Sequence, residues 1–283
     1  MLPTSSPSAG GSKGGNIHPP GSATLAFCRS GTQTVLSRAL AVSPLRVLTP
    51  RNHGSSAWVF LASLGGGLVD GDKLSVHADI AEGASAFLAT QASTKVYRSA
   101  HGCSASLTAR VEKGAALAIV PDPVVCFSGA RYRQEITVSL ASDASLVLLD
   151  GYTCGRSARG ERWQFARYAS RITVIREGAP VIIDATRLDP AQGSIAERMG
   201  RFDVVTSLIA MGPRFAPVRA AILASAPAPS PGGAAIAAAS PIAESGAILR
   251  VLADRFETAS RILRPSFSAL AQMLGDDPFA RKW

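Results

Sequence analysis

Hydrophobic and polar residues alternate through the middle of the chain, and each alternating stretch is followed by a more continuously apolar one. In residues 73–80 every second side chain is apolar, and after a turn at Gly83 residues 84–89 are nearly all apolar or small. Alternation with period 2 predicts a half-buried strand, and a short continuous apolar run predicts a fully buried one. The stretch therefore predicts a pair of strands joined by a tight turn.

This unit recurs three times, the last time more weakly. The later units span residues 103–120, 132–149 and 172–183, with turns near Gly114, Asp143 and Gly178. A spacing of roughly 30 residues is typical of stacked supersecondary units. The pattern predicts a mainly β fold with layered strand pairs, either a β-solenoid-like repeat or two packed sheets.

Polar, arginine-bearing loops follow the apolar strand of each unit. They comprise residues 91–100, 121–131, 150–161 and 185–199. Stacked units would bring these loops to one side of the molecule, so we expect them to form a shared functional face.

The carboxy-terminal part has a different pattern. Residues 204–211 and 248–252 are predicted strands, and residues 214–223 a short helix. Apolar residues at helical spacing predict a second helix over residues 254–274, which Pro265 is expected to kink or split.

Composition predicts one folded domain, a disordered amino-terminal tail and a flexible internal loop. Residues 1–22 are rich in Ser, Gly and Pro and predict a disordered tail, and Pro and Gly in residues 224–240 predict a flexible Ala/Pro loop. Residues 23–283 are expected to form a single β-rich domain, because 47% of the 283 residues are hydrophobic.

The net charge of +9 comes mainly from arginine, which suits bidentate pairing with carboxylates at interfaces. An acidic protein partner fits this charge. A nucleic-acid partner fits less well because no Lys/Arg run with interleaved aromatic residues is present. The four cysteines lie far apart, and the sequence shows no secretion signal and no long apolar span, which predicts reduced thiols, no membrane contact and a cytoplasmic location.

The glycine run at residues 65–67 invites a phosphate-loop interpretation, but Asp72 stands where a phosphate-binding Lys is needed. A tight bend is the better interpretation. Asp70 and Asp72 could bind a hard cation but more often mark a turn. His101 and Cys103 could contribute to a transient metal site. No residue has the setting of a catalytic nucleophile.

Residues 155–165 gather three arginines around Glu161. Glu161 could be a general base tuned by these arginines, an ion-paired acid that fixes a loop, or the neighbour of arginines that anchor an interface. We favour the last two together and predict no catalytic residues.

Three motifs resemble those of one family. Residues 64–99 contain a Gly-Gly, then Gly71-Asp72, then a Thr-Gln-x-x-x-Lys-Val-Tyr-Arg run at residues 90–98, and residues 121–134 and 155–165 continue the likeness. In this order they are similar to the urease accessory proteins of the UreD family, also called UreH.

The resemblance implies a β-rich scaffold that is not an enzyme. Such a protein would bind apo-urease with UreF and the GTPase UreG, which carries out any GTP chemistry, and would support nickel insertion into the dinickel centre of urease. It would hold no firmly bound cofactor, only nickel in transit.

The resemblance also supplies candidate residues. Those for partner binding are Gly66, Gly67, Gly71, Asp72, Thr90, Gln91, Lys95, Tyr97, Arg98, Pro121, Asp122, Pro123, Arg131, Gly155, Arg156, Arg159 and Glu161. Those for a transient nickel path are Asp72, Gln91, Asp122, Cys154 and Glu161.

Two alternatives remain. A β-solenoid that binds or cleaves an acidic polysaccharide would need rows of exposed aromatic residues, and aromatic residues make up only 6% of the chain. A nickel or zinc store would need more than four His and four Cys residues.

Overall fold

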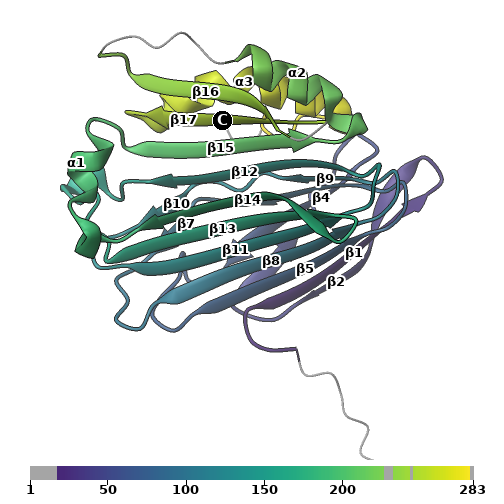
Figure 1. Ribbon diagram of the computed structural model, residues 1–283. Helices are drawn as coiled ribbons and strands as arrows, with labels where there is room; N and C mark the ends of the chain where they lie inside the picture. Colours follow the sequence, from purple (N-terminus) through teal and green to yellow (C-terminus); the bar gives the residue numbers. More distant parts are fainter. Residues whose placement is uncertain (1–17, 226–231, 243–244, 281–283) are drawn as a thin grey trace, which may run out of the picture.

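Two β-sheets packed face to face make up most of the molecule, and helices cover the outer side of one of them (Figure 1). The structure is a computed structural model that describes residues 18–225, 232–242 and 245–280. The expected disordered tail lies outside the described residues except for residues 18–22.

Sheet A has seven strands. In spatial order they are β14 (Ala179–Leu188), β13 (Arg167–Arg176), β11 (Arg131–Leu140), β8 (Cys103–Val111), β5 (Lys73–Ile80), β1 (Ser22–Ser30) and β2 (Gln33–Ala41). The five inner strands run parallel, and β14 and β2 pair antiparallel to them at the two edges.

Sheet B has ten strands, and eight of them form its main path. These are β16 (Ala235–Ile242), β17 (Gly246–Ala253), β15 (Val204–Met211), β12 (Ser145–Thr153), β9 (Ala116–Ile119), β6 (Ser85–Thr90), β4 (Ala57–Ser63) and β3 (Leu45–Leu48). The short strands β10 (Val124–Cys126) and β7 (Thr94–Val96) extend it beside β12.

Six helical segments complete the fold. They are the 3₁₀ turns η1 (Ser157–Arg159), η2 (Pro190–Gln192) and η3 (Pro213–Phe215), and the α-helices α1 (Ile195–Met199), α2 (Ala216–Ala224) and α3 (Phe256–Leu274). Helices α2 and α3 pack together on sheet B. No helix of the described residues is long and apolar enough to cross a membrane.

The predicted strand pairs occur, but the predicted solenoid-like repeat is not confirmed. In the first three units one strand enters sheet A and the next enters sheet B, and equivalent strands pair in parallel. The fourth unit instead turns back on itself, so that β13 and β14 form an antiparallel hairpin within sheet A. Sheet A therefore ends at the edge strand β14, and the parallel stacking of units stops at β13.

The core lies between the sheets, on the faces that the alternation predicts. Leu25, Phe27 and Ile80 from sheet A meet Leu88 and Leu117 from sheet B, and all are at most 1% exposed. Burying such a side chain contributes about 1.5–3 kcal/mol. A second core fills the space between sheet B and helices α2 and α3.

Two expectations about the carboxy-terminal part are wrong, namely a flexible loop over residues 235–240 and a helix split at Pro265. Residues 226–231 of the predicted loop lie outside the described residues. Residues 235–240 belong to strand β16 and not to a flexible loop, because they pair in continuous register with β17. Pro265 does not split α3, which continues through it. Leu263 and Leu270, on either side of the proline, are both buried in the second core, so packing holds the two halves together despite the missing N–H.

Candidate functional site

The four predicted loops lie together at one end of the sheets. Strand β7 of the first loop pairs in parallel with β10 of the second, and β10 pairs with β12, which leads into the third. Ile195 of the fourth loop shares a buried cluster with Cys154 and Trp163. We call the surface formed by residues 64–72, 90–99, 121–134 and 155–165 the motif face.

The glycine run forms the predicted bend and connects to the second part of its motif. Gly66 has φ +75°, and no atom lies within 4 Å of a Cβ added there, so its backbone conformation rather than crowding favours glycine. A Cβ on Gly67 would lie 2.7 Å from the Lys95 carbonyl oxygen. Leu68 donates to that carbonyl at 2.8 Å and accepts from Tyr97 N–H at 2.9 Å, which fixes the bend beside β7.

The acidic side chains after this bend cap turns. Both oxygens of Asp70 are engaged, by the N–H groups of His101 and Gly102 and by the His101 ring, all at 2.8 Å. The His101 hydrogen bond holds the pKa of Asp70 below its usual value. Asp72 accepts from Val69 N–H at 2.8 Å. This geometry matches the turn interpretation of the two acids.

A chain of contacts joins three of the loops. Glu161 receives two hydrogen bonds from the Arg156 guanidinium and one from Ser128 N–H, and the Arg156 contact lowers the pKa of Glu161. The Arg156 guanidinium lies 4.0 Å from the Phe127 ring centroid, and Tyr97 meets Phe127 edge-on at 5.1 Å. Glu161 is thus an ion-paired acid that fixes a loop, and its lowered pKa does not suit a general base.

Close backbone contacts tie the same loops together. A Cβ on Gly155 would lie 2.8 Å from the carbonyl oxygens of both Cys126 and Glu161. Asp122 N–H donates to the Thr90 hydroxyl at 2.8 Å. Arg131 N–H donates to the Ser99 hydroxyl at 2.9 Å. The motifs, distant in sequence, are therefore held as one surface.

The end of the third motif anchors the face to the body of the protein. Arg162 pairs with Asp203 and donates to backbone carbonyls of the same segment. The buried Trp163, whose φ is +57°, donates from its indole N–H to Phe202 O at 3.2 Å. Arg159, in contrast, is exposed.

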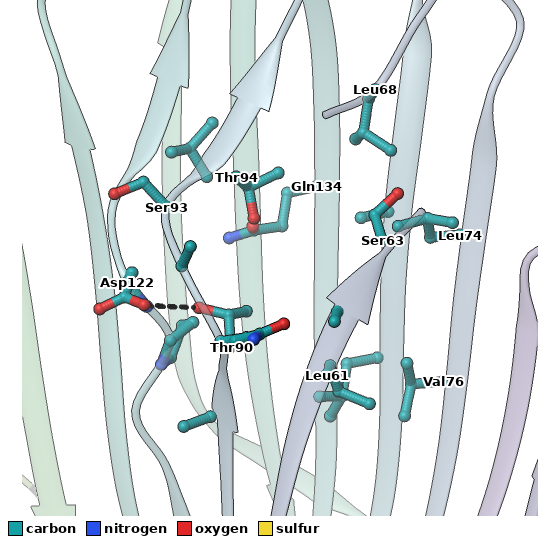
Figure 2. Close-up of a pocket in the computed structure, with 18 of the residues that line it drawn as sticks. Leu61, Ser63, Leu68, Leu74, Val76, Thr90, Ser93, Thr94, Asp122 and Gln134 are labelled. Atoms are coloured by element: carbon teal, nitrogen blue, oxygen red, sulfur yellow. Dashed lines mark hydrogen bonds between the residues drawn. The ribbon is translucent and has the colours of Figure 1, made fainter. Parts of the chain in front are cut away.

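A cavity of about 320 Å³ opens beneath the loops, between the sheets. Its wall is mostly apolar, with Leu61, Leu74 and Val76 on one side, and the Thr90–Asp122 hydrogen bond lies on the other (Figure 2). Gln91, Lys95 and Pro121 also line it. The cavity is an apolar space with a few polar groups near the motif face.

Asp150, which the sequence did not single out, is the carboxyl deepest in this cavity wall. It accepts from Gln134 Nε2 at 2.8 Å and from the Ser170 hydroxyl at 2.9 Å. Burial raises its pKa above the usual value. The fully buried Tyr168 hydroxyl nearby has no hydrogen-bond partner among the described residues. The sequence signal that could have identified Asp150 is its place as an acidic residue directly after the apolar run of β12.

The structure brings together two of the five residues expected on a nickel path. Gln91 and Asp122 line the cavity, whereas Asp72, Cys154 and Glu161 do not. Burial raises the pKa of the Cys154 thiol to about 12, so the free side chain is protonated at neutral pH. Within the described ranges, no three His, Cys, Asp or Glu side chains are grouped to hold a metal ion.

Comparison with known proteins agrees with the motifs. The family model described as "UreD urease accessory protein" matches residues 19–283. "Urease accessory protein UreD" of Sorangium cellulosum is 55% identical over 93% of this chain and 84% of its own length. The protein of the same name from Anaeromyxobacter sp. is 42% identical over 92% and 89%, and "Urease accessory protein D" of Arabidopsis thaliana is 30% identical over 88% and 96%. The chain therefore belongs to the UreD family of urease accessory proteins.

Proposed function

We propose that this protein is a scaffold that binds apo-urease together with UreF and UreG and supports nickel insertion into the urease active site. Family membership supports the urease role. The observation that carries the scaffold role is the chain of contacts Glu161–Arg156–Phe127–Tyr97, which joins the three family motifs into one surface.

The motif face offers side chains suited to a protein partner. Tyr97 is 37% exposed, and Lys95, Arg98 and Arg159 project from the same loops as exposed cations. Aromatic and arginine side chains are the usual anchors of protein interfaces, and cations select acidic surfaces. An acidic patch on a partner subunit would complement this face.

Nickel is cargo in this proposal and passes through the cavity. Asp122 near the motif face and Asp150 deeper in the wall provide carboxylate oxygens at intervals along an otherwise apolar space. Single oxygen ligands hold a divalent ion weakly, so it can be released onward. Asp72, Cys154 and Glu161 do not line the cavity and are left off this route.

Reconstitution tests the scaffold role. Apo-urease, UreF, UreG, GTP, nickel and bicarbonate are combined with and without this chain, and complex formation and urease activity are measured. We expect activation to require the chain. Arg159→Glu should weaken complex formation, whereas Arg261→Glu on α3, an exposed arginine away from the motif face, should not. Full activation without the chain would reject the scaffold role.

A second pair of variants tests the nickel route. Asp122→Asn can still accept a hydrogen bond from Thr90 but removes the charge, so the complex should form while activation at limiting nickel falls. Asp79→Asn, on the outer face of sheet A, is the matched control. Equal activation by the two variants would contradict a route past Asp122.

A polysaccharide-binding function finds less support. It requires rows of exposed aromatic side chains, and Tyr97 is the single aromatic residue among the large hydrophobic side chains that are exposed in the described ranges.

A further inference from the structure

The outer face of sheet A is open. In the part of the chain that the structure describes, α2 and α3 pack on sheet B, and sheet A forms the uncovered front layer (Figure 1). The outward side chains of its central strands are mostly Ser, Thr and charged residues.

Arginines gather at one corner of this face, where β11 and β13 begin and β14 ends. The arginine patch consists of Arg131, Arg133, Arg167, Arg171 and Arg187, all exposed and all on the outward phase of their strands. Arg131 stands directly beside Arg167, and Ala169 stands between Arg133 and Arg187. Neighbouring strands lie about 4.8 Å apart, so the five guanidinium groups share one small area.

The patch carries charge that its own acids do not neutralise. Glu135 pairs with Arg133, and Asp189 pairs with Arg187 at 3.2 Å. Arg131, Arg167 and Arg171 have no carboxylate within salt-bridge distance among the described residues. Arg131 and Arg167 stand directly opposite each other, and like charges so placed on neighbouring strands destabilise a sheet, whereas Arg171 stands opposite Glu135. A bound anion would remove this repulsion.

Apolar side chains continue the same face at the free edge of the sheet. Ile183 of β14 is 55% exposed and stands beside Thr173 of β13. Val181 is 36% exposed nearby. Strand β14 pairs only with β13 in the described structure. A charged patch and an apolar patch thus lie side by side at an edge.

We propose that the arginine patch docks an extended acidic segment of a partner protein. Carboxylates two residues apart in an extended chain are about 6.6–6.8 Å apart, the spacing of outward residues such as Arg131 and Arg133 along β11. Such a segment can place an apolar side chain over Ile183 while its carboxylates meet the arginines. Arg131 and Arg133 belong to both the motif face and this patch, whereas Arg167, Arg171 and Arg187 extend the patch onto the outer face of sheet A. The inference does not depend on urease as the partner.

A nucleic acid fits the patch less well than an acidic segment. The adjoining surface is aliphatic and offers no exposed ring for base stacking in the described strands. The apolar side chains instead match alternating residues of a peptide.

A peptide-binding assay tests the inference. The probe is a short fluorescein-labelled peptide with Glu at every second position and Ile at its centre, and fluorescence anisotropy with the full chain measures its affinity. The triple variant Arg131→Thr, Arg167→Thr, Arg171→Thr should bind at least tenfold more weakly. The control triple Arg255→Gln, Arg261→Gln, Arg264→Gln removes the same charge from exposed positions on or beside α3 and should change affinity less than twofold.

Two further measurements distinguish docking at the patch from a loss of folding and from attraction to net charge alone. The sheet triple should unfold at the same or a higher temperature than the parent chain, because it removes like-charge repulsion. Ile183→Ser should weaken binding of the Ile-centred peptide but not binding of a Gly-centred peptide. Equal losses in both triples, an affinity unchanged by the sheet triple, or tighter binding of a DNA duplex at the same patch would overturn the inference.

Discussion

Gly155→Ala should destabilise the protein far more than the chemically identical change at Gly160, five residues away. Gly155 has φ +111°, and its added Cβ would lie 2.8 Å from two backbone carbonyl oxygens, those of Cys126 and Glu161. Gly160 has φ +76°, and no atom lies within 4 Å of its added Cβ. The pair separates steric crowding from backbone strain.

The magnitudes follow from these contacts. Gly160→Ala incurs only the cost of a left-handed conformation, about 1–2 kcal/mol. Gly155→Ala incurs a similar or larger strain of about 1–3 kcal/mol and an overpacking cost of about 1–3 kcal/mol. The backbone oxygens at Gly155 cannot move as a flexible side chain would, so we expect about 4 kcal/mol in total.

Urea unfolding followed by tryptophan fluorescence measures the free energy of unfolding of both variants. The crowding at Gly155 also pushes the second and third motifs apart, so partner binding should fall even where the variant remains folded. If the two substitutions cost the same free energy, the close packing of these loops is not a feature of the folded protein.

Three further outcomes are expected. Leu68→Ala should lower the free energy of unfolding by about 3 kcal/mol because Leu68 is fully buried. Leu64→Ala should lower it by under about 0.5 kcal/mol because the Leu64 side chain is 48% exposed, and comparable unfolding midpoints of the two variants would refute this. Burial raises the pKa of Asp150, so its contribution to stability is present below the ordinary value of 3.8 and lost as pH rises through the raised one. Asp150→Asn should therefore gain stability relative to the parent as pH rises above about 4, and a difference that stays constant with pH would contradict the assignment. Burial raises the pKa of the Cys103 thiol to about 11 and that of the Cys154 thiol to about 12. Iodoacetamide at pH 8 should therefore modify the half-buried Cys28 first, and Cys103 and Cys154 only after unfolding, which mass spectrometry would show.

Local sequence patterns predicted the strands that a pattern of buried and exposed residues marks along their own length. The bounds of β5, β8 and β15 agree with the alternating and apolar stretches, because each strand buries one face or both and is bounded by a glycine or charged turn. No pattern identified β1, although it also alternates. Its place in sheet A depends on pairing with β5, which lies some 50 residues along the chain. The alternation is a local signal for a strand, but no short window shows that the partner of β1 is β5.

Helix and loop predictions failed where tertiary contacts outweigh local preference. The Ala-rich residues of β16 have little strand propensity, yet pairing with β17 makes them an edge strand. Pro265 disfavours a continuous helix, yet burial of Leu263 and Leu270 on either side holds α3 together.

The candidate site could be predicted only as three separate motifs. The sequence favoured an ion-paired Glu161 but did not show which of the three nearby arginines is its partner. It also did not show that the Phe127 ring packs against the guanidinium of that arginine. The Arg156–Phe127 contact joins loops from different repeat units, so only the folded arrangement reveals it. Asp150 was missed because its role depends on the cavity that forms between the sheets.

The parallel pairing of equivalent strands explains why the motifs form one face. Because β7 pairs with β10 and β10 with β12, the order of the loops along the chain is also their order in space. Each loop rests on the next, through Thr90 on Asp122 and through Phe127 on Arg156. A surface held in this way loses little conformational entropy when a partner binds, so more of the contact energy is available for affinity. For a protein that we propose acts by holding other proteins in place, such rigidity is the property that the fold has to supply.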